Sequence, residues 1–311
     1  EADSLNAAVL GPDVTPEDPE FALFVREIAS EMTVKAGQKC TAIRRAMVPE
    51  HVLPYVQDAL IARLQKTVIG DPQAEGVRMG ALASHEQIGR VEAEMNKLMA
   101  EQDLVYNPEV NPVGATAAGA FYTPKLFVNT DPMNKTAVHE VEPFGPVSTL
   151  MPYKTIDEAV ELTAKGRGSL VTSFVSKNTS DIVAFTTEAA AFNGRIHIVN
   201  EKMAKESTGH GSPMPLMKHG GPGRAGGGEE MGGKRGVLHY LHRTAVQGHP
   251  DDITAITSQY QPGAARPEAE PHVFRQHFEE LQVGATVYTA KHTVTETDIT
   301  NFANVSGDNF Y

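Results

Sequence analysis

The sequence predicts an α/β fold in which helices cover a layered sheet. Two short runs rich in β-branched residues, 171–175 and 196–199, are separated by a segment with helical spacing, 180–190. The chain opens in the same order, with an apolar run followed by an amphipathic stretch. Alternation of strands and helices along a chain is typical of α/β layers.

The first strand and helix are predicted directly upstream of the only cysteine, Cys40. The apolar run 6–10 ends in a Gly-Pro turn, as expected for a buried strand. Asp18 and Pro19 form an N-cap and first-turn pair, and apolar residues recur at helical spacing from there towards Gly37. This helix would end just before the cysteine.

Further elements follow between residues 50 and 163. Helices are predicted over 50–66 and 84–99 from apolar residues at helical spacing. The segment 121–128 indicates a strand, and Pro124 inside it favours an edge position, because proline donates no hydrogen bond to a neighbouring strand. A capping box that begins at Thr155 starts another helix.

Length and composition limit the class of protein. The 311 residues, 41% of them hydrophobic, are enough for one large or two medium domains with a sizeable core. The net charge of −12 argues against nucleic acid and anionic membranes as partners, since both attract clustered Lys and Arg. No apolar run approaches the roughly 20 residues that span a bilayer. One cysteine and no signal-like N-terminus indicate a cytoplasmic protein.

The composition changes twice in the last third of the chain. Nine of the seventeen residues in 220–236 are glycine, which predicts a loop. Residues 250–271 are polar and rich in proline, which predicts a linker between the region 1–249 and a second domain, 272–311. That domain would contain a strand over 284–289 and a helix capped at Thr295, and its abrupt stop suggests a piece of a longer polypeptide.

Cys40 is the first candidate for chemistry. It follows Gly37-Gln38-Lys39, where glycine allows a sharp bend and the lysine charge would favour the thiolate. A single thiol cannot form an internal disulfide, so its value lies in packing or in reactivity. A lone cysteine is more often a small buried hydrophobe than a nucleophile.

A second candidate is the motif Glu142-Pro143-Phe144-Gly145-Pro146. A carboxylate fixed beside an aromatic ring suits a ribose, whose diol would donate to the carboxylate while the ring packs alongside. The alternative is a plain turn between two strands.

Together, Glu1, the Cys40 motif, the Glu142 motif and the glycine-rich run resemble, in order and spacing, the catalytic half of the aldehyde dehydrogenase superfamily. The resemblance implies a layered α/β/α fold over 1–249, with Cys40 as nucleophile and Glu1 as general base. It implies a nicotinamide cofactor, NADP or else NAD, whose ribose contacts Glu142 and Phe144. Residues 238–247 resemble the strand that joins subunits of that family, so a homo-oligomer is expected. Glu1 is followed by Ala-Asp-Ser rather than the family's usual Leu-Gly-Gly.

The C-terminal segment 272–311 resembles the opening of the MaoC-like hot-dog hydratases, an α+β fold. The matching residues include Val283-Gly284, Phe302-Ala303 and Ser306-Gly307-Asp308, and Asp308 would be the catalytic aspartate. A dehydrogenase followed by a MaoC-like domain resembles the bifunctional ring-opening enzymes of phenylacetate degradation. Those enzymes hydrolyse oxepin-CoA and oxidise the resulting semialdehyde, so a CoA-thioester substrate is implied.

Charge suggests where such a substrate would bind. Residues 195–243 carry a net charge of +4, whereas the rest of the chain carries −16. Our hypothesis is that Lys218 and Arg224 attract the CoA phosphates. A basic oligomer interface is an equal alternative.

Two other functional interpretations remain open, and two motifs are rejected. The chain could be an inactive oligomerisation fragment, or the protein a MaoC-type hydratase with a degenerate dehydrogenase part. Residues 228–234 nearly spell a phosphate-binding loop, but Arg235 replaces the hydroxyl residue that would bind magnesium. His239 and His242 have no third ligand at zinc spacing, so no metal is expected.

Overall fold

The computed structural model describes residues 3–115, 118–213, 220–227, 241–265 and 279. The chain divides after Ala264 into a first compact unit and a second, 265–311. The helices and strands of the described residues all lie in the first unit. The predicted strand 284–289, the helix capped at Thr295 and nearly all of the predicted hot-dog segment lie outside the described residues.

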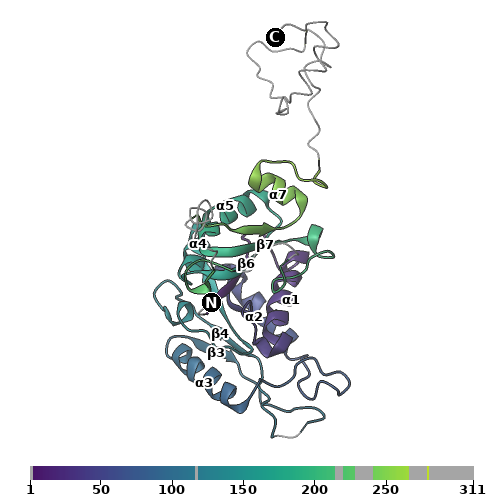
Figure 1. Cartoon of the computed structure of the whole chain (residues 1–311), viewed down its shortest axis with the longest axis vertical. Coiled ribbons are helices and arrows are strands. Elements are labelled where there is room, and N and C mark those ends of the chain that lie inside the picture. Colours follow the sequence, from purple (N-terminus) through teal and green to yellow (C-terminus); the bar gives the residue numbers. More distant parts are fainter. Residues whose placement is uncertain (1–2, 116–117, 214–219, 228–240, 266–278, 280–311) are drawn as a thin grey trace, which may run out of the picture. The chain divides into compact units, whose positions relative to one another are not determined.

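A mixed sheet of eight strands forms the centre of the described unit (Figure 1). Its order is β3-β4-β5-β2-β1-β6-β7-β8, and all neighbours are parallel except β3 and β4, which are antiparallel. The strands are β1 (Asn6–Leu10), β2 (Ile43–Pro49), β3 (Asp103–Tyr106), β4 (Lys125–Val128), β5 (Val147–Tyr153), β6 (Ser169–Val175), β7 (Asn193–Val199) and β8 (Ala245–Gln247).

Helices cover both faces of this sheet, which confirms the layered α/β prediction (Figure 1). The side chains of α1 and α2 pack on one face, and those of α4 and α5 pack on the other. The α-helices are α1 (Pro19–Thr33), α2 (Leu53–Leu64), α3 (His85–Met99), α4 (Ile156–Ala164), α5 (Thr179–Ala189) and α7 (Pro250–Thr257). Short 3₁₀ turns include η1 (Val34–Gly37), η2 (Glu50–Val52), η3 (Ala137–His139), η4 (Ala190–Phe192), η5 (Glu201–Met203) and η6 (Gly223–Ala225).

The sheet is buried on both faces, as a parallel sheet requires. All residues of β1, β2, β6 and β7 are buried. On one face Phe24 and Ile28 of α1 are fully buried against the strands. On the other the rings of Phe174 and Phe185 stack with centroids 4.4 Å apart. Each such buried side chain contributes about 2 kcal/mol of hydrophobic free energy, so the sheet forms a rigid base for the loops at its ends.

Two of the predicted helices, α3 and α4, begin with a capping hydrogen bond, whereas Asp18 occupies the N-cap position of α1 without one. Ser84 caps α3 by accepting a hydrogen bond from the amide of Gln87. Thr155 caps α4 by accepting from the amide of Glu158, whose carboxylate in turn accepts from the amide of Lys154. These local hydrogen bonds fix where each helix begins.

The prediction of an edge strand over 121–128 is wrong in two respects. Only residues 125–128 form a strand, β4, and Pro124 lies just before it. Strand β4 is interior, because β3 pairs with it on one side and β5 on the other. The proline therefore interrupts none of the hydrogen bonds between β4 and its neighbouring strands.

The first part of the segment predicted as a linker is helical. Residues 250–257 form α7, which packs against α5. Asp252 of this helix is buried and accepts a hydrogen bond of 2.6 Å from Asn200. The polar composition of this segment concealed a helix, because its most buried side chain is polar and Ile256 is only partly buried against the core.

Candidate active site

Cys40 lies in a sharp turn between α1 and β2, which we name the Cys40 turn (residues 35–42). Three successive residues, Lys35, Ala36 and Gly37, have positive φ angles of 54°, 50° and 67°. A left-handed backbone is costly for residues that carry a β-carbon, so surrounding contacts must impose it. The turn is therefore a strained, specified structure.

The side chain of Cys40 is half-buried. It packs at the margin of a small apolar cluster formed by Leu170, Val171 and Ala225. The thiol is thus neither sealed in a core nor fully exposed, which a reactive thiol requires.

Asn6 of β1 fixes the backbone of this turn. Its fully buried amide nitrogen donates to the carbonyl oxygens of Cys40, at 2.7 Å, and Ala42, at 3.2 Å. Its amide oxygen accepts from the Val171 amide at 3.1 Å and the Ser4 hydroxyl at 2.8 Å. The turn is therefore anchored to a central strand of the sheet.

Lys39, next to the cysteine in sequence, forms an ion pair with Glu31. Its ammonium group lies 2.6 Å from the carboxylate of Glu31, and both side chains are largely buried. Burial raises the pKa of Glu31 above its usual range, although the charge of Lys39 opposes this shift. The charge of Lys39 is therefore engaged by a carboxylate, which argues against the predicted support of the thiolate.

Arg44 of β2 connects the Cys40 turn to the Glu142 motif. Its guanidinium donates to the carbonyl oxygens of Gly37, at 2.9 Å, and Gly145, at 2.6 Å. It also donates to the carboxylate of Glu142 at 3.4 Å, and that carboxylate accepts from the Ser4 amide at 2.9 Å. Two motifs about 100 residues apart in sequence thus meet around one buried arginine.

Glu142 and Phe144 retain features that fit a ribose. The Glu142 side chain is 9% exposed, and burial raises its pKa, an effect that the Arg44 charge and the Ser4 amide oppose. Each carboxylate oxygen has one protein donor and can accept a second hydrogen bond. The Phe144 ring is exposed on one side, with Arg44 5.5 Å from its centroid. The pair therefore fits a diol next to an aromatic surface.

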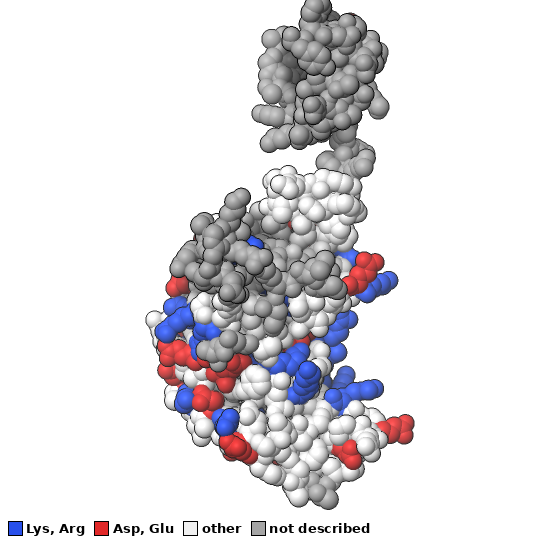
Figure 2. All heavy atoms as spheres, viewed as in Figure 1, with Lys and Arg blue, Asp and Glu red and all other residues white. Residues whose placement is uncertain are grey.

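Arg224 is committed to contacts within the protein. It donates to both carboxylate oxygens of Asp3 and to the carbonyl oxygens of His139, at 3.1 Å, and Glu140, at 2.9 Å. Acidic and basic side chains likewise lie next to one another on the left of Figure 2. These contacts favour a structural role for Arg224 over the predicted phosphate contact.

The described part of the glycine-rich run, 220–227, packs directly on the sheet. A β-carbon at Gly194 would lie 1.6 Å from the carbonyl oxygen of Gly220, and one at Gly168 would lie 2.0 Å from that of Pro222. Glycine is therefore required at 194 and 168, where two backbones touch. Within the run the same holds at Gly221 and Gly223, where a β-carbon would lie 2.5 Å from the carbonyl oxygen of Ser169 and 2.1 Å from that of Arg167.

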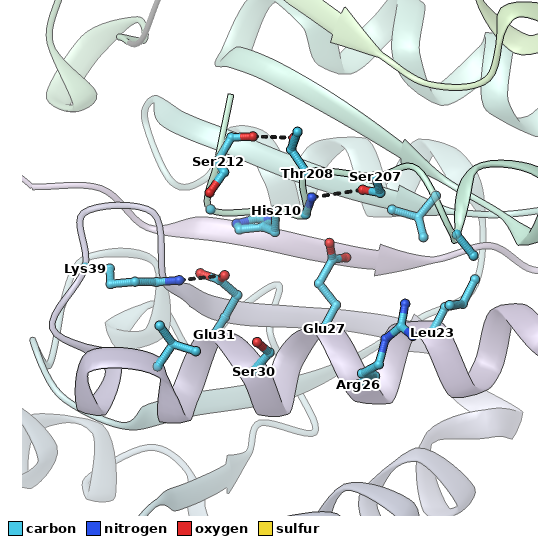
Figure 3. Close-up of a pocket in the computed structure, with 15 residues that line it drawn as sticks. Leu23, Arg26, Glu27, Ser30, Glu31, Lys39, Ser207, Thr208, His210 and Ser212 are labelled. Atoms are coloured by element: carbon cyan, nitrogen blue, oxygen red, sulfur yellow. Dashed lines mark hydrogen bonds and ion pairs between the residues drawn. The ribbon is translucent and has the colours of Figure 1, made fainter. Parts of the chain in front are cut away.

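A cavity of about 330 Å³ opens beside the Cys40 turn (Figure 3). One wall is α1, from which Glu27 and Glu31 project, and the opposite wall is the loop 207–212. Its other lining residues are Leu23, Arg26, Ser30, Val34, Lys39, Val199 and Ala204.

Several predicted site residues lie outside the described part of the chain, namely Glu1, Lys218 and Asp308. The structure brings Cys40 and Glu142 into one network through Arg44 and Ser4. Sequence reasoning missed Asn6, Arg44 and His210, whose side chains contact this region. Among the described residues no helix could cross a membrane, and no cluster of His, Cys, Asp and Glu could bind a metal ion.

Comparison with known sequences gives a family and two informative relatives. Residues 12–246 match the aldehyde dehydrogenase family. Protein MaoC of Klebsiella aerogenes is 47% identical over 234 residues, which are 75% of this chain and 69% of that protein. The 3,4-dehydroadipyl-CoA semialdehyde dehydrogenase of Aromatoleum evansii is 42% identical over 225 residues, 71% of this chain and 44% of that one.

Solved structures agree on the fold. A point mutant of aldehyde dehydrogenase C from Pseudomonas syringae, complexed with NAD+ and octanal, aligns with a TM-score of 0.59 and 25% identity over 73% of this chain and 43% of that one. The apo betaine aldehyde dehydrogenase of Staphylococcus aureus aligns with a TM-score of 0.62 and 24% identity over 76% of this chain and 44% of that one. This chain therefore spans less than half of either structure.

Proposed function

Because the chain belongs to the aldehyde dehydrogenase family, we propose that it forms the thiol-bearing part of an enzyme that oxidises a CoA-linked semialdehyde. The observation that carries the proposal is the placement of half-buried Cys40 in a strained turn, joined to Glu142 through Arg44. The identity of 42% to a dehydrogenase named for a CoA semialdehyde supports the substrate class.

In this proposal three residues of the chain have separate roles. The Cys40 sulfur adds to the aldehyde carbon, and after loss of a hydride the acyl group remains on sulfur as a thioester. Asn6 keeps the backbone of the turn in place throughout. Glu1 removes a proton from the water that attacks the thioester, which releases the acid and restores the thiol.

The proposed cofactor is a nicotinamide dinucleotide, with NADP expected before NAD. Glu142 would accept hydrogen bonds from its ribose, and the exposed side of Phe144 would pack against it. When bound, such a cofactor accepts the hydride. NAD+ in a structure of a family member supports a nicotinamide but does not choose between the two.

We extend the proposal to a second activity in the segment 272–311. This extension rests on the resemblance of the segment to the MaoC-like hydratases, in which Asp308 would activate water. The sequence of reactions would be opening of oxepin-CoA to a semialdehyde, as in phenylacetate catabolism, followed by oxidation to 3-oxo-5,6-dehydrosuberyl-CoA. Residues 238–247, whose end forms β8, would join subunits of a homo-oligomer.

The deciding experiment uses the full-length protein. It is mixed with NADP or NAD and an aldehyde, and absorbance of the reduced nicotinamide is followed, with Cys40→Ala as the matched variant. The proposal predicts reduction that depends on Cys40. An inactive scaffold would show no reduction and would leave an enoyl-CoA thioester unchanged in a parallel assay. A hydratase with a degenerate dehydrogenase part would consume that thioester but would not reduce the nicotinamide.

A further inference from the structure

A buried chain of polar side chains runs from α1 to the Cys40 turn. The Nε2 atom of His210 lies 2.9 Å from the carbonyl oxygen of Thr41. Its Nδ1 atom lies 2.8 Å from the hydroxyl of Ser173, which lies 3.3 Å from Nδ1 of His197. The same His197 nitrogen lies 3.3 Å from the carboxylate of Glu27. We name Glu27, His197, Ser173 and His210 the buried polar chain.

The position of each proton in the buried polar chain follows from the contact between His210 and the Thr41 carbonyl oxygen. A carbonyl oxygen only accepts, so Nε2 of His210 must carry the proton that it donates to Thr41. A neutral His210 then accepts at Nδ1, where the Ser173 hydroxyl donates. His197 accordingly directs its Nδ1 proton at Ser173 and Glu27. Each donor thus points along the chain in a defined direction.

The two ends of the buried polar chain differ in charge, since His210 is neutral and Glu27 is ionised. Burial lowers the pKa of His210 to about 3, so the ring is neutral at physiological pH. Burial alone would raise the pKa of Glu27, but the hydrogen bond and charge of His197 outweigh it and lower that pKa to about 2. Both the neutral ring and the imidazolium could donate from Nε2 to Thr41, but only the neutral ring can accept the Ser173 hydroxyl proton at Nδ1.

The contact of His210 completes the support of the cysteine backbone. Asn6 contacts the carbonyl oxygens on either side, at 40 and 42, and His210 contacts the one between them. Three successive carbonyl oxygens are therefore fixed by two buried side chains. His210 belongs to the loop 207–212, which lies close to the ion pair of Glu31 and Lys39, because a β-carbon at Gly211 would fall 2.9 Å from the end of either side chain.

We propose that His210 is a positioning residue for Cys40, which fixes the thiol through the Thr41 carbonyl and links it to the wall of the neighbouring cavity. This inference rests on the proposed function, in which Cys40 is the nucleophile. His210 itself touches neither substrate nor cofactor in this proposal. Its loss should lower the rate at which the thiol reacts, without a matching change in how the substrate binds.

The test compares two substitutions of His210, one that keeps the contact with Thr41 and one that loses it. Glutamine places an amide N–H near the position of Nε2, so His210→Gln can still donate to Thr41. Asparagine reaches only to the position of Nδ1, so His210→Asn can contact Ser173 but not Thr41. In the full-length protein we expect His210→Asn to lower kcat at least about tenfold with little change in KM, and His210→Gln to restore most of the loss.

A second readout keeps this inference separate from the proposed oxidation. The rate of alkylation of Cys40 by iodoacetamide reports thiol placement whether or not an aldehyde is oxidised. We expect it to change several-fold in His210→Asn and little in His210→Gln. His242→Asn is the matched control, since Nε2 of His242 also contacts a carbonyl oxygen, that of Ala190 at 2.9 Å, which belongs to η4 rather than to the Cys40 turn.

The outcomes are distinct. Equal losses in both His210 variants, together with equal drops in melting temperature, would show that His210 only packs the core and would overturn the inference. Altered alkylation in His210→Asn without any aldehyde oxidation by the parent protein would support the inference about placement and defeat the proposed function instead.

Discussion

Gly37 and Gly145 lie in direct backbone contact, although about 100 residues separate them. A β-carbon on Gly37 would fall 2.2 Å from the carbonyl oxygen of Gly145, and Gly37 also has a φ of +67°. The same carbonyl oxygens, 37 and 145, both accept from Arg44. The cysteine motif and the proposed ribose motif therefore form one packed unit.

Gly37→Ala should destabilise the protein by more than the cost of placing alanine in a left-handed backbone conformation. A left-handed alanine costs about 1–3 kcal/mol, and the clash with Gly145 adds to it because neither backbone can move freely. We expect a loss above about 3 kcal/mol in the free energy of unfolding, measured in urea. Gly76→Ala is the control, since Gly76 has a φ of +81° and nothing within 4 Å. A similar cost at both sites would refute a role for the close approach.

Arg44→Met should be strongly destabilising because it leaves the carboxylate of Glu142 buried without its charged partner. Breaking one side of a buried ion pair typically costs about 3–5 kcal/mol. The double variant Arg44→Met/Glu142→Gln removes the lone charge, so part of the loss should return in urea unfolding. No recovery would mean that the two carbonyl contacts of Arg44, rather than the ion pair, carry its stabilising effect.

Arg224→Glu should impair oxidation of a CoA-linked aldehyde and of a small neutral aldehyde to the same degree. The reason is structural, because Arg224 contacts Asp3 and two carbonyl oxygens and its reversal would disturb η6. Lys218→Glu tests the phosphate hypothesis directly and should weaken only the CoA-linked reaction. Steady-state kinetics with both aldehydes decide, and a selective effect of Arg224→Glu would restore the phosphate contact.

Stability should fall as the pH drops from about 6.5 towards 3, in part because of His139. Burial and then the Arg45 charge lower the pKa of His139 to about 3. The unfolded chain therefore binds a proton that the folded one does not, and acid favours unfolding by about 1.4 kcal/mol per pH unit for each such group. His139→Gln should flatten the slope of unfolding free energy between pH 6 and 4, as a series of urea titrations would show. His51→Gln on the surface is the control, and an unchanged slope in His139→Gln would contradict the assignment.

Elements with strong local signals could be predicted from the sequence. The capping residues Ser84 and Thr155 and the apolar periodicity after Pro19 give helices where the structure has them. Strand β3 has no such signal, because its residues are at least partly exposed and, within the described part of the chain, it pairs only with β4. Helix α7 has the composition of a linker because its fully buried side chain, Asp252, is polar, and Ile256 is only partly buried against the core.

The site was predictable only in part. The motifs around Cys40 and Glu142 are local, and resemblance to a family put them in one site. Arg44, Asn6 and His210 have no local signature, since each acts through carbonyl oxygens of residues distant in sequence. Such contacts depend on the packing of β1, β2 and the loop 207–212, which sequence spacing does not reveal.

The support of the Cys40 turn has a practical consequence. Asn6 and His210 contact main-chain oxygen atoms at 40, 41 and 42, and these atoms are the same whichever amino acid occupies the position. Exchanging the cysteine for alanine or serine should thus leave the path of the backbone intact. A crystal structure of such a variant with bound substrate would therefore show the substrate in a site with the native backbone. Any decrease in turnover of the variant would report the contribution of the sulfur atom alone.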